Sequence, residues 1–454
     1  MPEIDLLITG ATVVGPDGRR QVQVGVADGR IAYVGPDRPA ARSTVDAAGL
    51  LLLPGGVDTH VHLMDPGSTE REDFPAGTSA AAAAGVTTIV EHSHGNPVRR
   101  VEDLRVKVDY LRGRSNVDFG LAAHAWPGAA EAVAPLWEAG VTFFKVFTCT
   151  THGVPGHDAA ALRTHLRRTA EVGAVTLMHC EDESLTSEAE KELRAAGRQD
   201  AGLLLDWRNR DAELVAAAVA AMLVRRTGAR ATLAHVSNSE VARYVQAERE
   251  RGARLAVESC PQYFILRENE VHQHGALRKF TPPARARVDD DEDQMWRLLR
   301  SGVLTHMSSD HAPATLEQKR AGDIWQVHFG LPGLDSTYAL LLDAAARGRL
   351  AYEDVVRVYC QAPAQAYGLW PRKGSLLPGA DADLVLVDPG ARRTLRDADV
   401  LSKAGWTPYD GREVTGRVVR TYLRGEPVAR DGVPVGALTG RFLPGPGAAV
   451  VRSD

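Results

Sequence analysis

Residues 54–62 read Pro54-Gly-Gly-Val-Asp-Thr-His-Val-His62. This stretch combines the end of a predicted strand with two candidate metal ligands. It continues the apolar run that begins at Leu51. Because strand side chains repeat every two residues, His60 and His62 point to the same side. Two imidazoles placed in this way can hold one metal ion. Polar ligands at the end of an apolar strand are typical of the active-site face of a parallel barrel.

The middle of the chain repeats this arrangement of an apolar run followed by a helical stretch. Eight apolar runs with helical connectors predict an α/β fold, a parallel (β/α)8 TIM barrel. A doubly wound open sheet is the alternative, although no Gly-x-Gly-x-x-Gly opens a helix after the first strand, which argues against its nucleotide-binding version. The predicted strands are 51–62, 86–92, 117–125, 141–147, 174–180, 230–236, 254–259 and 303–309.

Both chain ends have a different pattern, with short strand-like segments and tight turns. Asp17-Gly18 and Asp28-Gly29 near the start are strong hairpin signals, and Arg424-Gly425 and Asp431-Gly432 supply turns near the end. We therefore predict that residues 1–54 and 371–454 together form one small β-sandwich domain. Residues 55–370 then form the barrel domain that carries the site.

Composition limits the classes of partner. A formal net charge of −5 gives no reason to expect nucleic acid or an anionic membrane surface. The start has no basic and apolar leader, and no apolar run reaches the ~20 residues of a membrane helix. Cys149, Cys180, Cys260 and Cys360 lack the spacing of a cysteine metal site or a disulfide framework. We expect a cytoplasmic protein that does not bind a membrane.

Further residues of metal-ligand type follow later strands. His179 and His235 each end an apolar run, although either one alone is more often a core or supporting residue. Asp310 ends the eighth run, where a buried carboxylate needs a charged partner. Lys145 lies inside the fourth run and has two interpretations. It either reaches water from an edge strand, or it is a neutral amine that captures CO2 as a carbamate between two cations.

These motifs resemble those of the amidohydrolase superfamily, specifically the cyclic amidohydrolase branch of dihydroorotases, hydantoinases (dihydropyrimidinases) and allantoinases. The resemblance covers nearly the whole chain. Besides residues 54–62 and Phe144-Lys145-Val-Phe, it rests on His179-Cys-Glu-Asp, His235-Val-Ser, Glu258-Ser-Cys-Pro-Gln-Tyr, Thr281-Pro-Pro-Ala-Arg, Ser309-Asp-His-Ala-Pro, Tyr367-Gly-Leu-Trp-Pro-Arg-Lys-Gly and Gly379-Ala-Asp-Ala-Asp-Leu-Val.

The resemblance implies a metal-dependent hydrolase for a small cyclic amide. A hydroxide bridging two divalent metals would attack the ring carbonyl, and Asp310 would carry the proton to the departing nitrogen. Zinc is the expected metal, with manganese, cobalt and iron compatible. Dimers or tetramers are implied as well. In this assignment one metal is held by His60, His62 and Asp310, the other by His179 and His235, and carboxylated Lys145 bridges them.

The substrate pocket departs from each subfamily. Met64 stands where dihydroorotases carry an arginine for the substrate carboxylate, and Ala314 stands where they carry a histidine. His94 aligns roughly with an asparagine that helps hold the same carboxylate. Thr150 replaces the oxyanion-stabilising tyrosine of hydantoinases, and Phe329 replaces their asparagine. These departures argue against a dihydroorotase and against classical hydantoinase activity, and they leave an unusual ring substrate open.

Other pocket positions remain open. Thr281 is a candidate pocket residue, and His311 is expected to support the site rather than to react. His92 and His94 either contact substrate or hydrogen-bond their own loop. Three alternatives for the function stand: a dihydroorotase, a non-catalytic oligomeric scaffold related to dihydropyrimidinase, and a linear-amide or deaminating relative. Metal content separates the scaffold from the enzymes.

Overall fold

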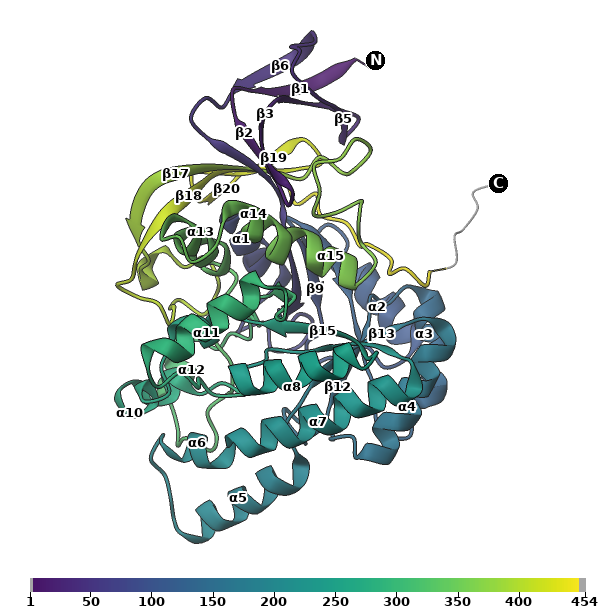
Figure 1. Cartoon of the computed structure of the whole chain (residues 1–454), viewed down its shortest axis with the longest axis vertical. Coiled ribbons are helices and arrows are strands. Elements are labelled where there is room, and N and C mark those ends of the chain that lie inside the picture. The colour runs from purple at the N-terminus through teal and green to yellow at the C-terminus, as the bar shows by residue number, and fades with distance from the viewer. Residues whose placement is uncertain (1–2, 449–454) are drawn as a thin grey trace.

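The two chain ends fold together into the β-rich upper part of the molecule in Figure 1. The computed structural model describes residues 3–448. One apolar core, with Val24 and Ile31 on one sheet and Leu52 and Leu384 on the other, joins two sheets. The first has the order β5 (Arg30–Gly35), β4 (Gln23–Ala27), β1 (Ile4–Thr9), β6 (Ala41–Asp46), and the second has the order β20 (Val433–Pro434), β19 (Glu426–Arg430), β18 (Glu413–Leu423), β17 (Leu384–Thr394), β7 (Leu51–Pro54), β2 (Thr12–Gly15), β3 (Gly18–Gln21).

The hairpin signals of the sequence lie at real turns. Asp28 and Gly29 have φ values of 50° and 73° between β4 and β5, and Asp431 and Gly432 have 51° and 82° between β19 and β20. Two successive residues with positive φ make the type of turn that matches the twist of the flanking strands. Asp-Gly pairs therefore predict these hairpins for a physical reason.

The middle of the chain forms the parallel barrel. Its strands pair in two stretches, β8-β9-β10 and β11 through β16. The two stretches join where Leu121 O accepts from Thr142 N–H at 2.8 Å, and the ring closes where His62 N–H donates to His311 O at 2.8 Å. The strands are β8 (Gly56–Val61), β9 (Val86–Glu91), β10 (Asp118–Leu121), β11 (Ala123–His124), β12 (Phe144–Phe147), β13 (Val175–His179), β14 (Arg230–Leu233), β15 (Arg254–Ser259) and β16 (His306–Met307).

The stretch 51–62 is two strands rather than the single strand expected. β7 pairs with β17 and β2 in the sandwich, and β8 pairs with β9 in the barrel. The change of sheet occurs at Gly55, where an added Cβ would lie 2.0 Å from Thr87 Oγ1. Pro54 has no N–H to continue a ladder. The chain therefore passes from one sheet to the other at Pro54-Gly55.

The helices alternate with the barrel strands and surround them (Figure 1). α7 shows why they form: Asn209 caps its first turn by accepting from Ala212 N–H at 2.9 Å, its alanines pack inward, and Gly228 ends it at φ 71°. Within residues 3–448 none of the helices has the length and apolar character to cross a bilayer. The helices are α1 (Phe74–Ala84), α2 (Val101–Leu111), α3 (Val133–Ala139), α4 (Ala159–Val172), α5 (Glu183–Ala195), α6 (Leu203–Trp207), α7 (Arg210–Thr227), α8 (Ser239–Glu250), α9 (Gln262–Ile265), α10 (Glu270–His274), α11 (Asp289–Arg300), α12 (Leu316–Arg320), α13 (Thr337–Ala346), α14 (Tyr352–Val356) and α15 (Ala362–Ala366).

A buried charge cluster connects the sandwich to the barrel. Lys373 is 1% exposed, and its Nζ lies 2.6 Å from Asp118, 3.0 Å from Asp381 and 2.8 Å from Asp383. Arg424 also contacts Asp118. Burial opposes the charge of Lys373, but the three carboxylates outweigh it and raise the pKa of the ammonium.

Residues 441–443 lie along the barrel. Phe119 N–H donates to Arg441 O at 3.0 Å, and Leu443 N–H donates to Phe119 O at 2.8 Å. This segment therefore pairs alongside β10 of the barrel rather than with a sandwich sheet. The domain limits at residues 54 and 371 remain a prediction.

Candidate metal centre and active site

His60, His62 and Asp310 meet at the carboxyl end of the barrel. His60 and His62 come from the end of β8, and Asp310 follows β16. His60 Nε2 lies 3.2 Å and His62 Nε2 3.6 Å from Asp310 Oδ1. Asp310 adopts a φ of 48°, a left-handed conformation that costs a non-glycine residue about 1–2 kcal/mol. Burial raises the pKa of its carboxyl group.

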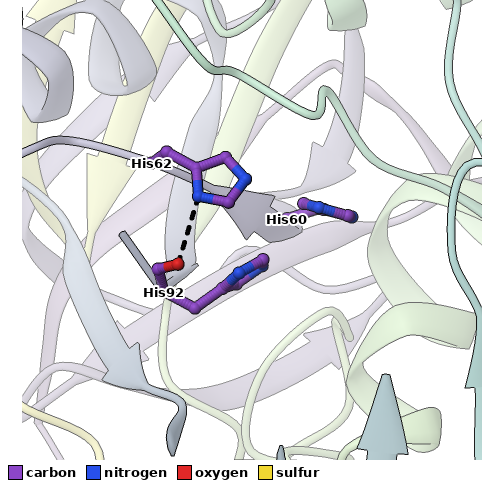
Figure 2. A group of neighbouring side chains, drawn as sticks. All are labelled: His60, His62 and His92. Atoms are coloured by element: carbon purple, nitrogen blue, oxygen red, sulfur yellow. Dashed lines mark hydrogen bonds between the residues drawn. The ribbon is translucent and has the colours of Figure 1, made fainter. Parts of the chain in front are cut away.

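Hydrogen bonds fix which ring nitrogen of each histidine faces this point. His60 Nδ1–H donates to Glu258 Oε1 at 2.6 Å. His62 Nδ1–H donates to the backbone oxygen of His92 at 3.1 Å (Figure 2). Both Nε2 lone pairs are therefore left for a metal, as the outer partners of ligating histidines usually arrange.

His179 and His235 form the second group. His179 Nδ1 lies 2.9 Å from His235 Nε2, and His179 Nε2–H donates to Glu181 Oε2 at 2.7 Å. Glu181 also accepts from Arg208 at 3.3 Å and from Thr281 Oγ1 at 2.7 Å. Burial opposes ionisation of Glu181, but Arg208 and His179 lower its pKa to about 2. Glu181 is thus a carboxylate that orients His179.

Cys149 lies beside this second group. Its Sγ accepts from Arg208 Nη1 at 3.2 Å. Burial nevertheless raises the pKa of the thiol to about 12. Cys149 and Glu181 thus share one partner, Arg208, beside His179.

Lys145 lies beside the first group and lines the same cavity as His179 and His235. It is 1% exposed on β12, and its Nζ is 3.3 Å from His60 Nε2. Burial lowers the pKa of the amine to about 8, although Asp310 and Glu258 oppose the shift. The neutral amine is therefore more accessible here than in an exposed lysine.

The donor atoms fit a pair of divalent cations. Imidazole nitrogens and a carboxylate oxygen face one another here. The second nitrogen of His60, His62 and His179 is hydrogen-bonded elsewhere, and that of His235 is buried. Nitrogen and oxygen donors of this type suit zinc and similar ions. The residues predicted from five separate barrel strands are thus brought together.

A cavity opens beside these donors. The rings of His94 and His152 stack at 4.0 Å with an angle of 15°, and the Phe329 ring lies edge-on to His152 at 6.0 Å. Three of the candidate pocket residues, His94, Thr281 and Phe329, line it. The described lining residues are His60, His62, His94, Lys145, Phe147, His152, His179, His235, Thr281, Asp310, Ala312, Phe329 and Gly330.

The other four candidate pocket residues are not among the described lining residues. Met64 is buried at φ 56°, with its N–H bonded to Ser93 Oγ at 2.8 Å. Thr150 is exposed, and its N–H contacts Glu183. His311 is buried with its Nε2 3.3 Å from Glu72. Ala314 is also buried, and its carbonyl accepts from the Trp406 indole at 2.9 Å.

Sequence reasoning did not select Phe147, His152, Ala312 and Gly330 as lining residues. Phe147 was detectable, because it lies two residues after Lys145 and so shares its face of the strand. Ala312 and Gly330 have small side chains that carry no chemical signal. His152 lies in the loop after β12, and its stacking on His94 depends on loop geometry that periodicity does not predict.

A buried lysine holds the wall that carries Phe329. Lys319, 1% exposed, donates to the backbone oxygens of Lys279, His328 and Gly330, each at 3.0 Å. Gly330 N–H donates to Lys279 O at 3.0 Å as well. The three ammonium donors are therefore used to fix both flanks of Phe329.

Comparison with known proteins agrees with this site. The sequence model of the amidohydrolase family matches residues 51–428. The chain belongs to the amidohydrolase family. This amidohydrolase is 35% identical over 451 residues to the allantoinase of Rubrobacter xylanophilus, with 98% of both chains covered. It is 34% identical over 448 residues to the allantoinase of Deinococcus radiodurans, with 97% of this chain and 98% of that one covered.

Solved structures support the same branch. The L-hydantoinase (dihydropyrimidinase) from Arthrobacter aurescens superposes with a TM-score of 0.92 at 29% identity, covering 97% of this chain and 99% of that one. The dihydropyrimidinase from Brevibacillus agri gives 0.91 at 28%, covering 98% and 99%. The predicted barrel fold and the predicted cyclic amidohydrolase branch are confirmed. This amidohydrolase is a metal-dependent enzyme that hydrolyses C–N bonds in cyclic amides.

Proposed function

We propose that the chain opens a cyclic ureide of the allantoin or hydantoin type, using two zinc ions. The observation that carries this proposal is that two groups of donor atoms and Lys145 line one cavity. His60, His62 and Asp310 would hold one ion, and His179 and His235 would hold the other. Lys145 would bridge the pair as a carbamate.

Formation of the carbamate follows from the setting of Lys145. A neutral amine adds its nitrogen lone pair to the carbon of CO2 and loses one proton. The buried position of Lys145 favours that neutral form. The product carries two oxygens and a negative charge, which suits a position between two cations.

Two ions held by these residues would supply Lewis-acid chemistry, which polarises a carbonyl and acidifies water. The remaining work falls to side chains of this chain. Asp310 Oδ1, close to His60 and His62, is placed to take the proton of the attacking water and to deliver it to the ring nitrogen as the C–N bond breaks. The product is an open-chain acid with a ureido or amide group.

The neutral ureide is favoured over dihydroorotate by the cavity wall. Lys145 is the only lysine or arginine among the described lining residues, and Met64 is buried and not among them. A substrate carboxylate therefore finds no free cationic partner there. Sequence similarity to allantoinases over nearly the whole chain supports allantoin as the first substrate to test. Likeness to hydantoinase structures makes hydantoin the second.

The test is a substrate screen on purified protein supplied with zinc and bicarbonate. Allantoin, hydantoin, dihydrouracil and dihydroorotate are offered to the wild type and to Asp310→Asn. We expect ring opening of allantoin or hydantoin that is lost in the variant. Opening of dihydroorotate alone would overturn the substrate class, and a protein that binds no metal would favour the non-catalytic scaffold.

We also propose that the enzyme is a homodimer or homotetramer in the cytoplasm. The proposal rests on the likeness to hydantoinase structures and on the sequence expectations above. Light scattering on the purified protein measures the mass directly. A monomer at micromolar concentration would refute the oligomer.

A further inference from the structure

His92 lies directly against the first group of metal donors. It follows β9, at the same end of the barrel as His60 and His62. Its ring centroid is 4.6 Å from that of His60 and 4.5 Å from that of His62. Figure 2 shows the imidazole rings of His60, His62 and His92 close together. One nitrogen from each can be chosen so that all three lie within 4.8 Å of one another.

The backbone and the ring of His92 are used differently. Its carbonyl oxygen accepts from His62 Nδ1–H at 3.1 Å and from His124 Nε2–H at 2.9 Å. Its ring, 1% exposed, has both nitrogens buried and without a hydrogen-bond partner among residues 3–448. Positioning of His62 therefore needs only the peptide group of residue 92, and the side chain is left unexplained.

An unpaired imidazole in this place is costly to the fold. Buried polar groups are almost always paired, and each exception calls for a bound water, an ion or a catalytic role. A neutral imidazole has one nitrogen lone pair, which is the form that binds metals.

We propose that His92 supplies a third imidazole to the cation held by His60 and His62. The inference rests on the metal pair of the proposed function. With Asp310 and the proposed carbamate of Lys145, the first position would then offer three nitrogens and two oxygens. That donor set favours zinc or cobalt over magnesium or manganese at this position.

The most direct test is a crystal structure of the zinc-loaded wild type with anomalous data at the zinc edge. The expected result is a His92 nitrogen at ~2.1 Å from the first zinc ion. A distance above ~3 Å, or a water between them, would overturn the proposal. Absence of both zinc ions would instead count against the proposed function itself, so the two failures are distinguishable.

A variant pair gives a second readout that does not depend on activity. His92→Leu removes the ring nitrogens but keeps the carbonyl that orients His62. We expect its affinity for the first zinc ion, measured by chelator competition, to fall by about tenfold or more. Cobalt-substituted protein should also lose one imidazole by X-ray absorption.

The matched control is His165→Leu. His165 is a buried histidine on α4 whose Nε2 contacts Thr176 at 3.2 Å, away from the donors. It should bind zinc as the wild type does. Equal affinity and equal imidazole count in His92→Leu and the control would refute the role of His92. If His92→Leu does not fold, the crystal structure of the wild type still decides.

Discussion

Glu258 should set the metal affinity of the site without touching a metal. Its Oε1 accepts from His60 Nδ1–H at 2.6 Å and from His235 N–H at 3.3 Å, so one carboxylate orients residues of both donor groups. Burial opposes its charge, but His60 and His306 hold the pKa of Glu258 well below its usual range. The hydrogen bond to His60 is therefore charge-assisted, about twice as strong as a neutral one.

Two substitutions of Glu258 should weaken zinc binding to different extents. Outer partners of ligating histidines are worth about 10- to 100-fold in affinity, which corresponds to about 1.4 to 2.8 kcal/mol. Glu258→Gln keeps an acceptor oxygen but removes the charge, so we expect about a tenfold loss. Glu258→Ala removes the acceptor too, so we expect about a hundredfold loss.

Zinc dissociation constants from competition with a coloured chelator provide the assay, and thermal unfolding of each apo-protein checks the fold. Glu248→Gln is the control, because the Glu248 side chain is only 4% exposed but pairs with Arg225 on α7 and with Arg251 just after α8. Zinc binding by both Glu258 variants at wild-type strength would refute the reasoning, as would a loss of the same size in the control.

Three other perturbations follow from the structure. Lys373→Met removes the buried ammonium shared by three carboxylates, although Asp118 and Asp381 keep Arg424 and Arg372 as partners. It should cost about 3 kcal/mol, measured as a lower denaturation midpoint in urea at pH 7, and an unchanged midpoint contradicts this. Because the pKa of Lys373 is raised, its contribution is complete at pH 7 and is lost only above the ordinary lysine range. Lys319→Met removes the hydrogen bonds that hold both flanks of Phe329. KM should therefore rise about tenfold or more, with kcat far less changed. An unchanged KM would show that Lys319 does not position this cavity wall. Lys145→Ala removes the bridge and should lower turnover by about a hundredfold or more, with partial recovery in added acetate or propionate; full activity without them contradicts the carbamate.

The fold could be predicted from the sequence where turn residues and the pattern of apolar residues indicated the same element. The Asp-Gly turns predicted hairpins, and buried apolar runs predicted barrel strands, because parallel strands covered on both faces carry few polar residues. The division of 51–62 between two sheets was not accessible. Pro54-Gly55 marks a break, but the partner of each half is decided by tertiary contacts with Thr87 and β17.

The candidate donors were also predictable, because ligands at strand ends carry their chemistry in the residue type. His60, His62, Lys145 and Asp310 stand out against apolar surroundings and lie together in the structure. The pocket wall was less accessible. His152 and Gly330 reach the cavity through loop conformations, and Lys319 acts through backbone carbonyls that no sequence pattern records.

The central claim is a two-metal site that opens a cyclic amide. The measurement that tests it most directly is zinc content and ring opening on the same sample of wild-type protein, purified without metal and reloaded with zinc in bicarbonate. The account expects activity that grows with loading and reaches its plateau at two zinc ions per chain. A protein that reaches full activity with no bound metal, or that binds two zinc ions and opens no ring ureide or amide, would contradict it.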